Sequence, residues 1–161
     1  MKLLEIERKY LIKNDFKKYV VKSYRIKQGF LSIDPERTVR IRTYENKGFL
    51  TIKGKGSNNG TTRFEWEKEI PFNDAKQLLK LCKPSIIDKT RYIISIKDDL
   101  FFEVDEFYGD NKGLVIAEIE LPTEDSLFNK PNWLGKEVTG EKKYYNSMLS
   151  QTPYNTWKKN E

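Results

Sequence analysis

Polar and apolar residues alternate along most of this chain, a pattern typical of β-strands that pack one face against a core. The first alternating run spans residues 3–12. Asn46-Lys47-Gly48 predicts a hairpin turn. Because most connections are short, we expect antiparallel pairing. Seven further runs are predicted strands: residues 24–32, 38–44, 49–54, 63–70, 87–94, 100–107 and 114–121.

A few short segments have helical spacing or helix-capping residues. The clearest spans residues 73–81, where Ala75, Leu78 and Leu79 recur at helical spacing. Three others are residues 14–20, 123–128 and 140–151. The expected N-caps of these four helices are Asn14 or Asp15, Asn73, Thr123 and Thr139.

These elements predict an α+β fold that is mainly β. About eight strands close into a barrel with room for one small ligand. We therefore expect an eight-stranded antiparallel β-barrel, a tunnel with a few short flanking helices. A single domain is expected over residues 1–150, followed by a loose tail of residues 151–161.

Charged residues two positions apart mark the polar face of nearly every predicted strand. Residues i and i+2 of a strand point to the same side of the sheet. Any one such doublet is also what an ordinary half-exposed sheet shows. Taken together, however, acidic strands and basic strands follow one another along the chain. The doublets are Glu5 and Glu7, Arg40 and Arg42, Glu65 and Glu67, Lys89 and Arg91, Glu103 and Asp105, and Glu118 and Glu120.

If these doublets face a common interior, their charges must pair, keep water, or bind a metal ion and a ligand. The chain has no histidine and a single cysteine, Cys82, so a bound metal would be held by oxygen ligands. Carboxylates and water select hard cations such as Mg²⁺ or Mn²⁺. Arginine doublets bind phosphate oxygens, so a triphosphate bridged by a divalent cation suits such an interior.

The net charge of the 161-residue chain is +6, which favours an anionic partner. Paired carboxylates would repel a nucleic-acid backbone, so we expect a small phosphate compound and no nucleic acid. The absence of a run of about 18 apolar residues argues against a membrane span. The lone Cys82 excludes an internal disulfide bond and agrees with a reducing cytoplasm.

The motifs resemble one family. Glu5-Ile6-Glu7-Arg8-Lys9 matches the E-x-E-x-K signature of the CYTH superfamily, also called triphosphate tunnel metalloenzymes. The resemblance runs from about residue 3 to about residue 150 and continues in the order of the family's motifs. It is carried by Lys27-Gln28-Gly29-Phe30-Leu31, Val39-Arg40-Ile41-Arg42, Leu50-Thr51-Ile52-Lys53, Glu65-Trp66-Glu67, Lys89-Thr90-Arg91, Glu103-Val104-Asp105, Glu118-Ile119-Glu120 and the segment from Trp133 to Asn146.

The resemblance implies an eight-stranded tunnel and metal-dependent hydrolysis of a triphosphate, with inorganic tripolyphosphate as the leading substrate. Lys9 is the catalytic candidate, either as a base whose pKa is lowered by other cations or as a charge that stabilises the transferring phosphoryl group. Lys143 is expected either to close over the ligand or to lie on a solvated helix face. The expected metal ligands are Glu5, Glu7, Asp105, Glu118 and Glu120, and the expected phosphate ligands are Arg40, Arg42, Lys53, Lys89 and Arg91.

Several alternatives stay open at this point. Glu65, Glu67 and Glu103 suit structural ion pairs as well as ligand binding. The chain could be an adenylyl cyclase or a catalytically idle binder of polyphosphate or nucleotide, and a homodimer is open. Phe30 stands where short family members often have a tyrosine that pairs with the lysine of the first motif. Without that phenol, Lys9 is expected to act alone or with water.

Overall fold

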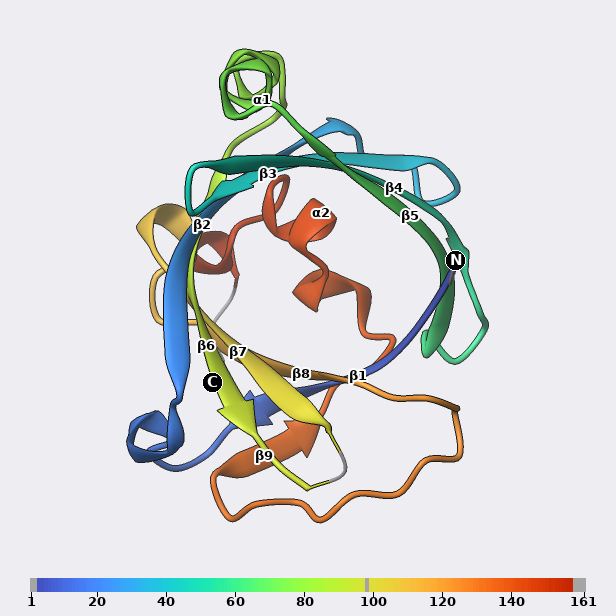
Figure 1. The fold of residues 1–161 in the computed structure, drawn as a ribbon, viewed down its shortest axis with the longest axis vertical. Coiled ribbons are helices and arrows are strands. Elements are labelled where there is room, and N and C mark those ends of the chain that lie inside the picture. Colours follow the sequence, from blue (N-terminus) through green and yellow to red (C-terminus); the bar gives the residue numbers. More distant parts are fainter. Residues whose placement is uncertain (1–2, 98, 158–161) are drawn as a thin grey trace.

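The strands form one closed barrel. The structure is a computed structural model that describes residues 3–97 and 99–157, and within these residues nine strands make one antiparallel sheet. Eight of them close the barrel in the order β5-β4-β3-β2-β6-β7-β8-β1, because β1 (Leu4–Ile12) pairs with both β8 and β5 (Figure 1). The predicted eight-stranded antiparallel barrel is therefore confirmed. The other strands are β2 (Lys22–Ser32), β3 (Thr38–Tyr44), β4 (Lys47–Gly56), β5 (Thr62–Ile70), β6 (Ile87–Ser95), β7 (Phe101–Phe107), β8 (Val115–Glu120) and β9 (Leu134–Glu137).

The sequence pattern did not predict β9. This strand pairs with the second half of β1, with Tyr10 opposite Glu137 and Ile12 opposite Leu134. It contains Gly135, where a Cβ atom would lie only 2.9 Å from the carbonyl oxygen of Leu11. The close approach of two backbones requires glycine here, and a four-residue strand with a central glycine shows no clear alternation.

The hairpin between β3 and β4 is confirmed, with its turn shifted toward the N-terminus. Glu45 and Asn46 are the turn residues, with φ angles of 51° and 62°. Two-residue hairpin turns require this left-handed backbone. Gly48 instead lies in β4, where a Cβ atom would be 2.5 Å from the Cβ of Ala75. The glycine thus lets a helix pack closely against the sheet.

That helix is α1 (Phe72–Leu79), which lies on the outer surface of the barrel over β3 and β4 (Figure 1). The predicted helix is confirmed, but Asn73 as its cap is wrong. The helix begins one residue earlier, after Pro71, whose carbonyl accepts the first helical hydrogen bond from Ala75. The proline ends β5, and its fixed φ angle suits the start of a helix. Its side chain has no polar atom, so no side-chain cap forms.

The other predicted helices are shorter than expected or absent. Residues 14–20 contain only a 3-10 turn, and residues 123–128 contain no helix. Thr139 does not cap a helix. Its hydroxyl accepts a hydrogen bond from the backbone N–H of Lys9 and donates one to the carboxylate of Glu137. Local capping signals were misleading because contacts with the barrel set the backbone of these segments. The remaining helices are the 3-10 turns Lys17–Tyr19, Gly109–Asn111, Lys142–Tyr144 and Tyr154–Thr156 and the short α2 (Asn146–Leu149).

The main apolar core lies outside the barrel wall. Phe102, Val104 and Ile119 point outward from β7 and β8 and pack with Tyr10 and Trp133. Since side chains alternate along a strand, the charged neighbours of these residues point inward. The barrel therefore has an inverted arrangement, with apolar residues on part of its outer surface and charges in its lumen.

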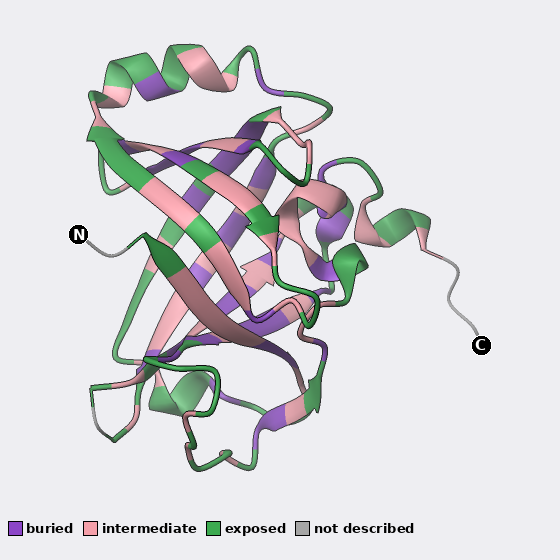
Figure 2. Ribbon diagram, turned by 90° about the vertical axis from the view of Figure 1, so that its right-hand side faces the viewer, coloured by how far each residue is buried: buried purple, intermediate pink, exposed green. Residues whose placement is uncertain are grey.

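The C-terminal segment, residues 139–150, covers one end of the barrel. Figure 1 shows α2 inside the ring of strands, and Figure 2 shows this segment at the right-hand end of the barrel. Its residues Tyr144 and Leu149 pack on Ile87, Phe107 and Ile116, which form an apolar floor within the lumen. No helix in the described residues has the length and apolar character needed to cross a lipid bilayer.

Candidate active site

The lumen contains a cavity of about 490 Å³ with charged walls. Ten of the twelve residues predicted for the site line this cavity, which agrees with the inward direction expected for the charged doublets. The other two, Asp105 and Lys143, do not line it. The ten are Glu5, Glu7, Lys9, Arg40, Arg42, Lys53, Lys89, Arg91, Glu118 and Glu120.

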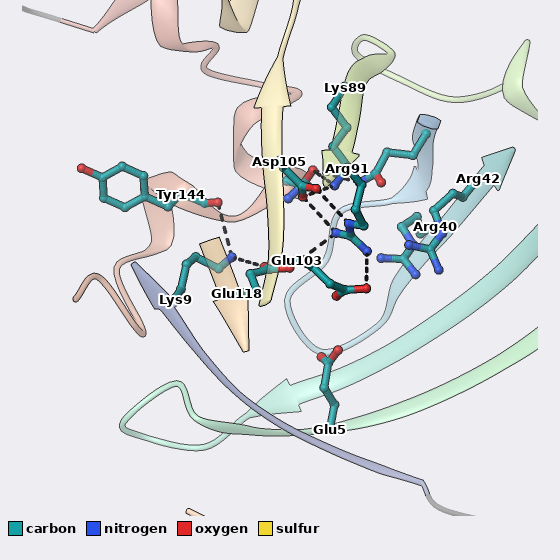
Figure 3. Close-up of polar contacts among 12 residues, drawn as sticks. Glu5, Lys9, Arg40, Arg42, Lys89, Arg91, Glu103, Asp105, Glu118 and Tyr144 are labelled. Carbon is teal, nitrogen blue, oxygen red and sulfur yellow. Dashed lines mark hydrogen bonds and ion pairs between the residues drawn. The ribbon is translucent and has the colours of Figure 1, made fainter. Parts of the chain in front are cut away.

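The charges are sorted by sign around the barrel. The strands β3 and β6, on either side of β2, carry the cations Arg40, Arg42, Lys89 and Arg91. The opposite strands β8, β1 and β5 carry the carboxylates. Figure 3 shows the guanidinium groups of Arg40, Arg42 and Arg91 near one another, with Glu5 pointing toward the same space from β1. A cationic wall thus faces an acidic wall across the cavity.

Arg40 and Arg42 share a single carboxylate. Their Nη2 atoms lie 3.2 Å and 3.1 Å from Oε2 of Glu67, which also accepts a hydrogen bond of 2.6 Å from Thr51. Burial, followed by repulsion from Arg40 and Arg91, lowers the pKa of Arg42 to about 10. This wall therefore has more positive charge than its own carboxylates neutralise, which favours a bound anion.

Lys53 connects the two walls. Its ammonium lies 2.9 Å from Oε1 of Glu5 and 3.4 Å from Oε2 of Glu65. Although burial alone would raise the pKa of Glu5, Lys53 outweighs burial and lowers that pKa to about 2. Glu5 is therefore a carboxylate at neutral pH, as a metal ligand must be.

Asp105 holds two of the cations from behind. It is 2% exposed, and its oxygens lie 2.8 Å from Nζ of Lys89 and 2.8 Å from Nε of Arg91. Arg91 also forms ion pairs with Glu103 at 3.3 Å and Glu118 at 3.5 Å. Both oxygens of Asp105 are occupied by cations, so the structure does not support its predicted role as a metal ligand. The residue instead positions two expected phosphate ligands.

We expect Asp105→Asn to destabilise the protein by about 3 kcal/mol or more, because it leaves Lys89 and Arg91 as buried charges without their shared partner. Urea denaturation of the variant and of wild type measures this change. Arg25→Gln is a matched control, since the ion pair of Arg25 with Asp88 lies on the outer surface. An Asp105→Asn variant as stable as wild type would contradict this structural role.

Lys9 lies among carboxylates, not among cations as its predicted role as a base required. Its ammonium lies 3.2 Å from Oε2 of Glu118 and 3.5 Å from the carbonyl oxygen of Tyr144. Burial opposes the charge, but Glu118 and then Glu7 outweigh it and raise the pKa of Lys9. The expectation of a lowered pKa is therefore wrong, and Lys9 is a cation at neutral pH.

The charge of Glu7 is poorly compensated by its surroundings, although Lys53 and Lys9 act on it from a distance. Burial, followed by repulsion from Glu118 and Glu5, raises its pKa well above the ordinary value. Within residues 3–97 and 99–157, no lysine or arginine forms an ion pair with Glu7.

No three carboxylates of these residues form a preassembled metal site, because lysines and Arg91 hold Glu5 and Glu118. The donors are nevertheless all oxygen atoms, and a divalent cation would neutralise Glu7, so this wall fits a hard metal ion.

Comparison with known proteins identifies the family. A family model described as the CYTH domain matches residues 3–153. This chain is a member of the CYTH domain family. An inorganic triphosphatase of Acetivibrio thermocellus is 44% identical over 155 residues, which cover 96% of this chain and 97% of that protein. An inorganic triphosphatase of Nitrosomonas europaea is 32% identical over 151 residues, which cover 92% and 97%.

A solved structure agrees with this assignment. The crystal structure described as that of the inorganic triphosphatase NE1496 matches this CYTH domain with a TM-score of 0.65 and 29% identity. The match covers 90% of this chain and 96% of the other chain. The barrel described above is thus the fold of a CYTH protein over nearly its whole length.

Several cavity residues of this CYTH domain were not predicted. Lys142, Tyr145 and Asn146 come from the C-terminal segment, and Arg63 comes from the start of β5. Asn146 accepts hydrogen bonds of 3.1 Å from both Gln28 and Lys89, which ties the segment to the barrel floor. An irregular segment has no repeat that reveals its inward face. The sequence pattern therefore did not indicate that the three residues of the C-terminal segment reach the cavity, whereas Arg63 shares the strand face of Glu65 and Glu67 and could have been predicted from that spacing.

Lys143 points away from the cavity, which Lys142 lines in its place. The ammonium of Lys143 lies 5.2 Å from the ring centre of Tyr144 and 4.8 Å from that of Trp157. Since a 3-10 turn places successive side chains on different sides, only one of the two lysines can face inward. The structure does not support Lys143 as a residue that closes over the ligand.

Proposed function

We propose that this CYTH domain is a divalent-metal-dependent triphosphatase that hydrolyses the terminal phosphoanhydride of inorganic tripolyphosphate. One observation carries the proposal: a wall of arginines and lysines faces a wall of carboxylates across a water-accessible cavity. A triphosphate with a divalent cation presents the complementary charges to both walls. The two relatives described as inorganic triphosphatases support the choice of substrate.

The cationic wall is proposed to bind the phosphate oxygens. Arg40 and Arg42 share one carboxylate, so the two guanidinium groups have donors in excess that phosphate oxygens can accept. Lys89 and Arg91 are held in place by Asp105, which reduces the entropy lost on binding. Lys53 reaches the ligand from the strand between the two walls.

The acidic wall is proposed to hold the metal ion through Glu5, Glu7, Glu118 and Glu120, with Mg²⁺ or Mn²⁺ as the ion. Such a cation, when bound, screens the charge of the phosphate oxygens and lowers the pKa of a water molecule. Glu7 supports this role most directly, because its charge lacks an ion-pairing partner within the described residues. Glu5 and Glu118 would exchange part of their lysine contacts for the ion.

Lys9 is proposed to stabilise negative charge on the transferring phosphoryl group. Its raised pKa keeps it protonated, so it cannot remove a proton from water at neutral pH. A fixed cation in a buried site stabilises developing charge more strongly than the same cation in water does. The lysine therefore contributes to turnover as a charge.

The test is a substrate panel. Purified protein is incubated separately with inorganic tripolyphosphate, ATP and thiamine triphosphate, each with Mg²⁺, Mn²⁺ or EDTA, and released phosphate and cyclic AMP are measured. We expect phosphate release from tripolyphosphate to exceed that from either organic triphosphate by about tenfold or more, because the facing walls of cations and carboxylates match a compact chain of phosphates with its metal ion. EDTA is expected to abolish it.

Other outcomes would redirect the assignment. Cyclic AMP formed from ATP would identify a cyclase instead, and phosphate release unaffected by EDTA would contradict the role of the acidic wall. Binding of tripolyphosphate with no turnover of any compound would identify a binding module. Each result is read against Glu36→Gln, a surface variant that leaves the cavity intact.

A further inference from the structure

Two polar groups in the cavity have no role in the mechanism above: the hydroxyl of Tyr145 and the guanidinium of Arg63. Both residues line the cavity. Tyr145 belongs to the C-terminal segment, and Arg63 lies at the beginning of β5, where it is paired in register with Glu5. The two residues are far apart in the sequence, yet they line the same cavity.

The ring of Tyr145 packs against the ammonium of Lys9, whose Nζ lies 5.0 Å from the ring centre. The hydroxyl lies near Gly60, since a Cβ atom on that glycine would be 3.2 Å from it. Within residues 3–97 and 99–157, this hydroxyl makes no hydrogen bond. It is therefore a donor that remains available to a ligand in the cavity.

Arg63 differs from the other arginines of the cavity in its partners. Its Nε donates to the carbonyl of Gly54 at 2.6 Å, and its Nη2 donates to Thr38 Oγ1 at 2.7 Å. These uncharged acceptors fix the plane of the guanidinium without neutralising it. In the described part of the chain, no carboxylate lies within ion-pairing distance of Arg63. Burial lowers the pKa of Arg63, and Glu5, Tyr145, Glu7 and Glu65 oppose this effect only from farther away.

A contact between two glycines brings Tyr145 and Arg63 together. A Cβ atom on Gly60 would lie 2.4 Å from the Cα of Gly140, and the two residues have φ angles of +75° and +79°. Only glycine allows both the backbone angle and the distance. The loop between β4 and β5 therefore lies directly against the C-terminal segment, beside the first residues of β5.

We propose that the Tyr145 hydroxyl and the Arg63 guanidinium bind the same phosphoryl group of the triphosphate, at the end of the cavity covered by the C-terminal segment. The inference rests on the proposed function. A fixed cation without a carboxylate partner, beside an unused hydroxyl donor, provides what phosphate oxygens accept. Tyr145 also places an aromatic ring against Lys9 in a chain that has phenylalanine at position 30.

The test compares Tyr145→Phe, Arg63→Gln and the double variant. Binding of sodium tripolyphosphate in EDTA is measured by titration calorimetry, so no turnover interferes. Tyr145→Phe removes only the hydroxyl and keeps the ring against Lys9. Each single variant is expected to raise Kd by about tenfold, the loss of one hydrogen bond to a charged group. The double variant is expected to lose less than the product of the two factors, because both contacts serve one phosphoryl group.

Tyr19→Phe and Arg25→Gln are the matched controls, since both residues lie on the outer surface. Their Kd and melting temperature are expected to equal those of wild type. Unchanged Kd in both single cavity variants, or fully multiplicative losses in the double variant, would overturn the inference. If Arg63→Gln fails to fold, an unchanged Kd of Tyr145→Phe alone overturns it. A wild-type protein that neither binds nor hydrolyses tripolyphosphate would instead overturn the proposed function.

Discussion

Arg42→Ala is expected to lower kcat/KM for tripolyphosphate by about 10³-fold, the scale of losing an arginine that stabilises a transferring phosphoryl group. The same change is expected to leave the folded state at least as stable as wild type. Arg42 is buried beside Arg40 and Arg91, and its Nε makes no hydrogen bond among the described residues. Its pKa is lowered to about 10, so the fold disfavours its charge. Glu67 keeps Arg40 and Thr51 as partners when Arg42 is removed.

Steady-state kinetics and thermal melting of the same preparation separate the two effects. Arg25→Ala is the matched control, because it removes an arginine and an ion pair from the outer face of β2 and should leave kcat/KM unchanged. Arg42→Lys should recover only part of the loss, since lysine keeps the charge but not the two-pronged hydrogen bonding. Wild-type kcat/KM in Arg42→Ala would show that the cationic wall does not bind the reacting phosphoryl group.

Glu7→Gln is the second change with a large expected effect. It should lower metal-dependent turnover by about 100-fold or more. Losing a metal ligand should reduce activity at least as much as losing a residue that only orients such a ligand. In EDTA, by contrast, the variant should be more stable than wild type. The pKa of Glu7 is raised by burial and by Glu118 and Glu5, so its charge opposes folding when no metal ion is bound.

Urea denaturation with EDTA and with Mg²⁺ or Mn²⁺ measures this difference directly. Divalent ions are expected to stabilise wild type, since a ligand that binds only the folded state raises its stability. They should stabilise Glu7→Gln much less. Glu45→Gln, on the exposed turn between β3 and β4, is the control and should respond to metal as wild type does. Equal stabilisation of Glu7→Gln and wild type would place the metal ion elsewhere.

Much of the barrel could be predicted from the sequence because strand periodicity is a local property. The alternation that separates Phe102 and Val104 from Glu103 and Asp105 is present in the residues themselves, whatever the strand pairs with. It predicted eight strands of the closed barrel and the side chains that share each face. It did not predict β9 or the short helices, whose backbones are set by contacts with the barrel.

The site was predicted less completely, and the misses have a common origin. Asp105 has the spacing of a luminal carboxylate, but its neighbours across the sheet, Lys89 and Arg91, occupy both of its oxygens. Lys9 was expected among cations, yet β1 lies beside β8, so Glu118 is its register partner. Which charges meet depends on strand order, and the spacing within one strand contains no information about it.

The sequence by itself determined that this chain forms strands with one charged and one apolar face, and which residues share each face. Only the tertiary structure decided that the charged faces turn inward, that cations and carboxylates lie on opposite walls, and that Tyr145 and Arg63 line the same cavity. The physical reason is range: alternation follows from the backbone of a single strand, whereas these contacts require barrel closure and a C-terminal segment packed across its end.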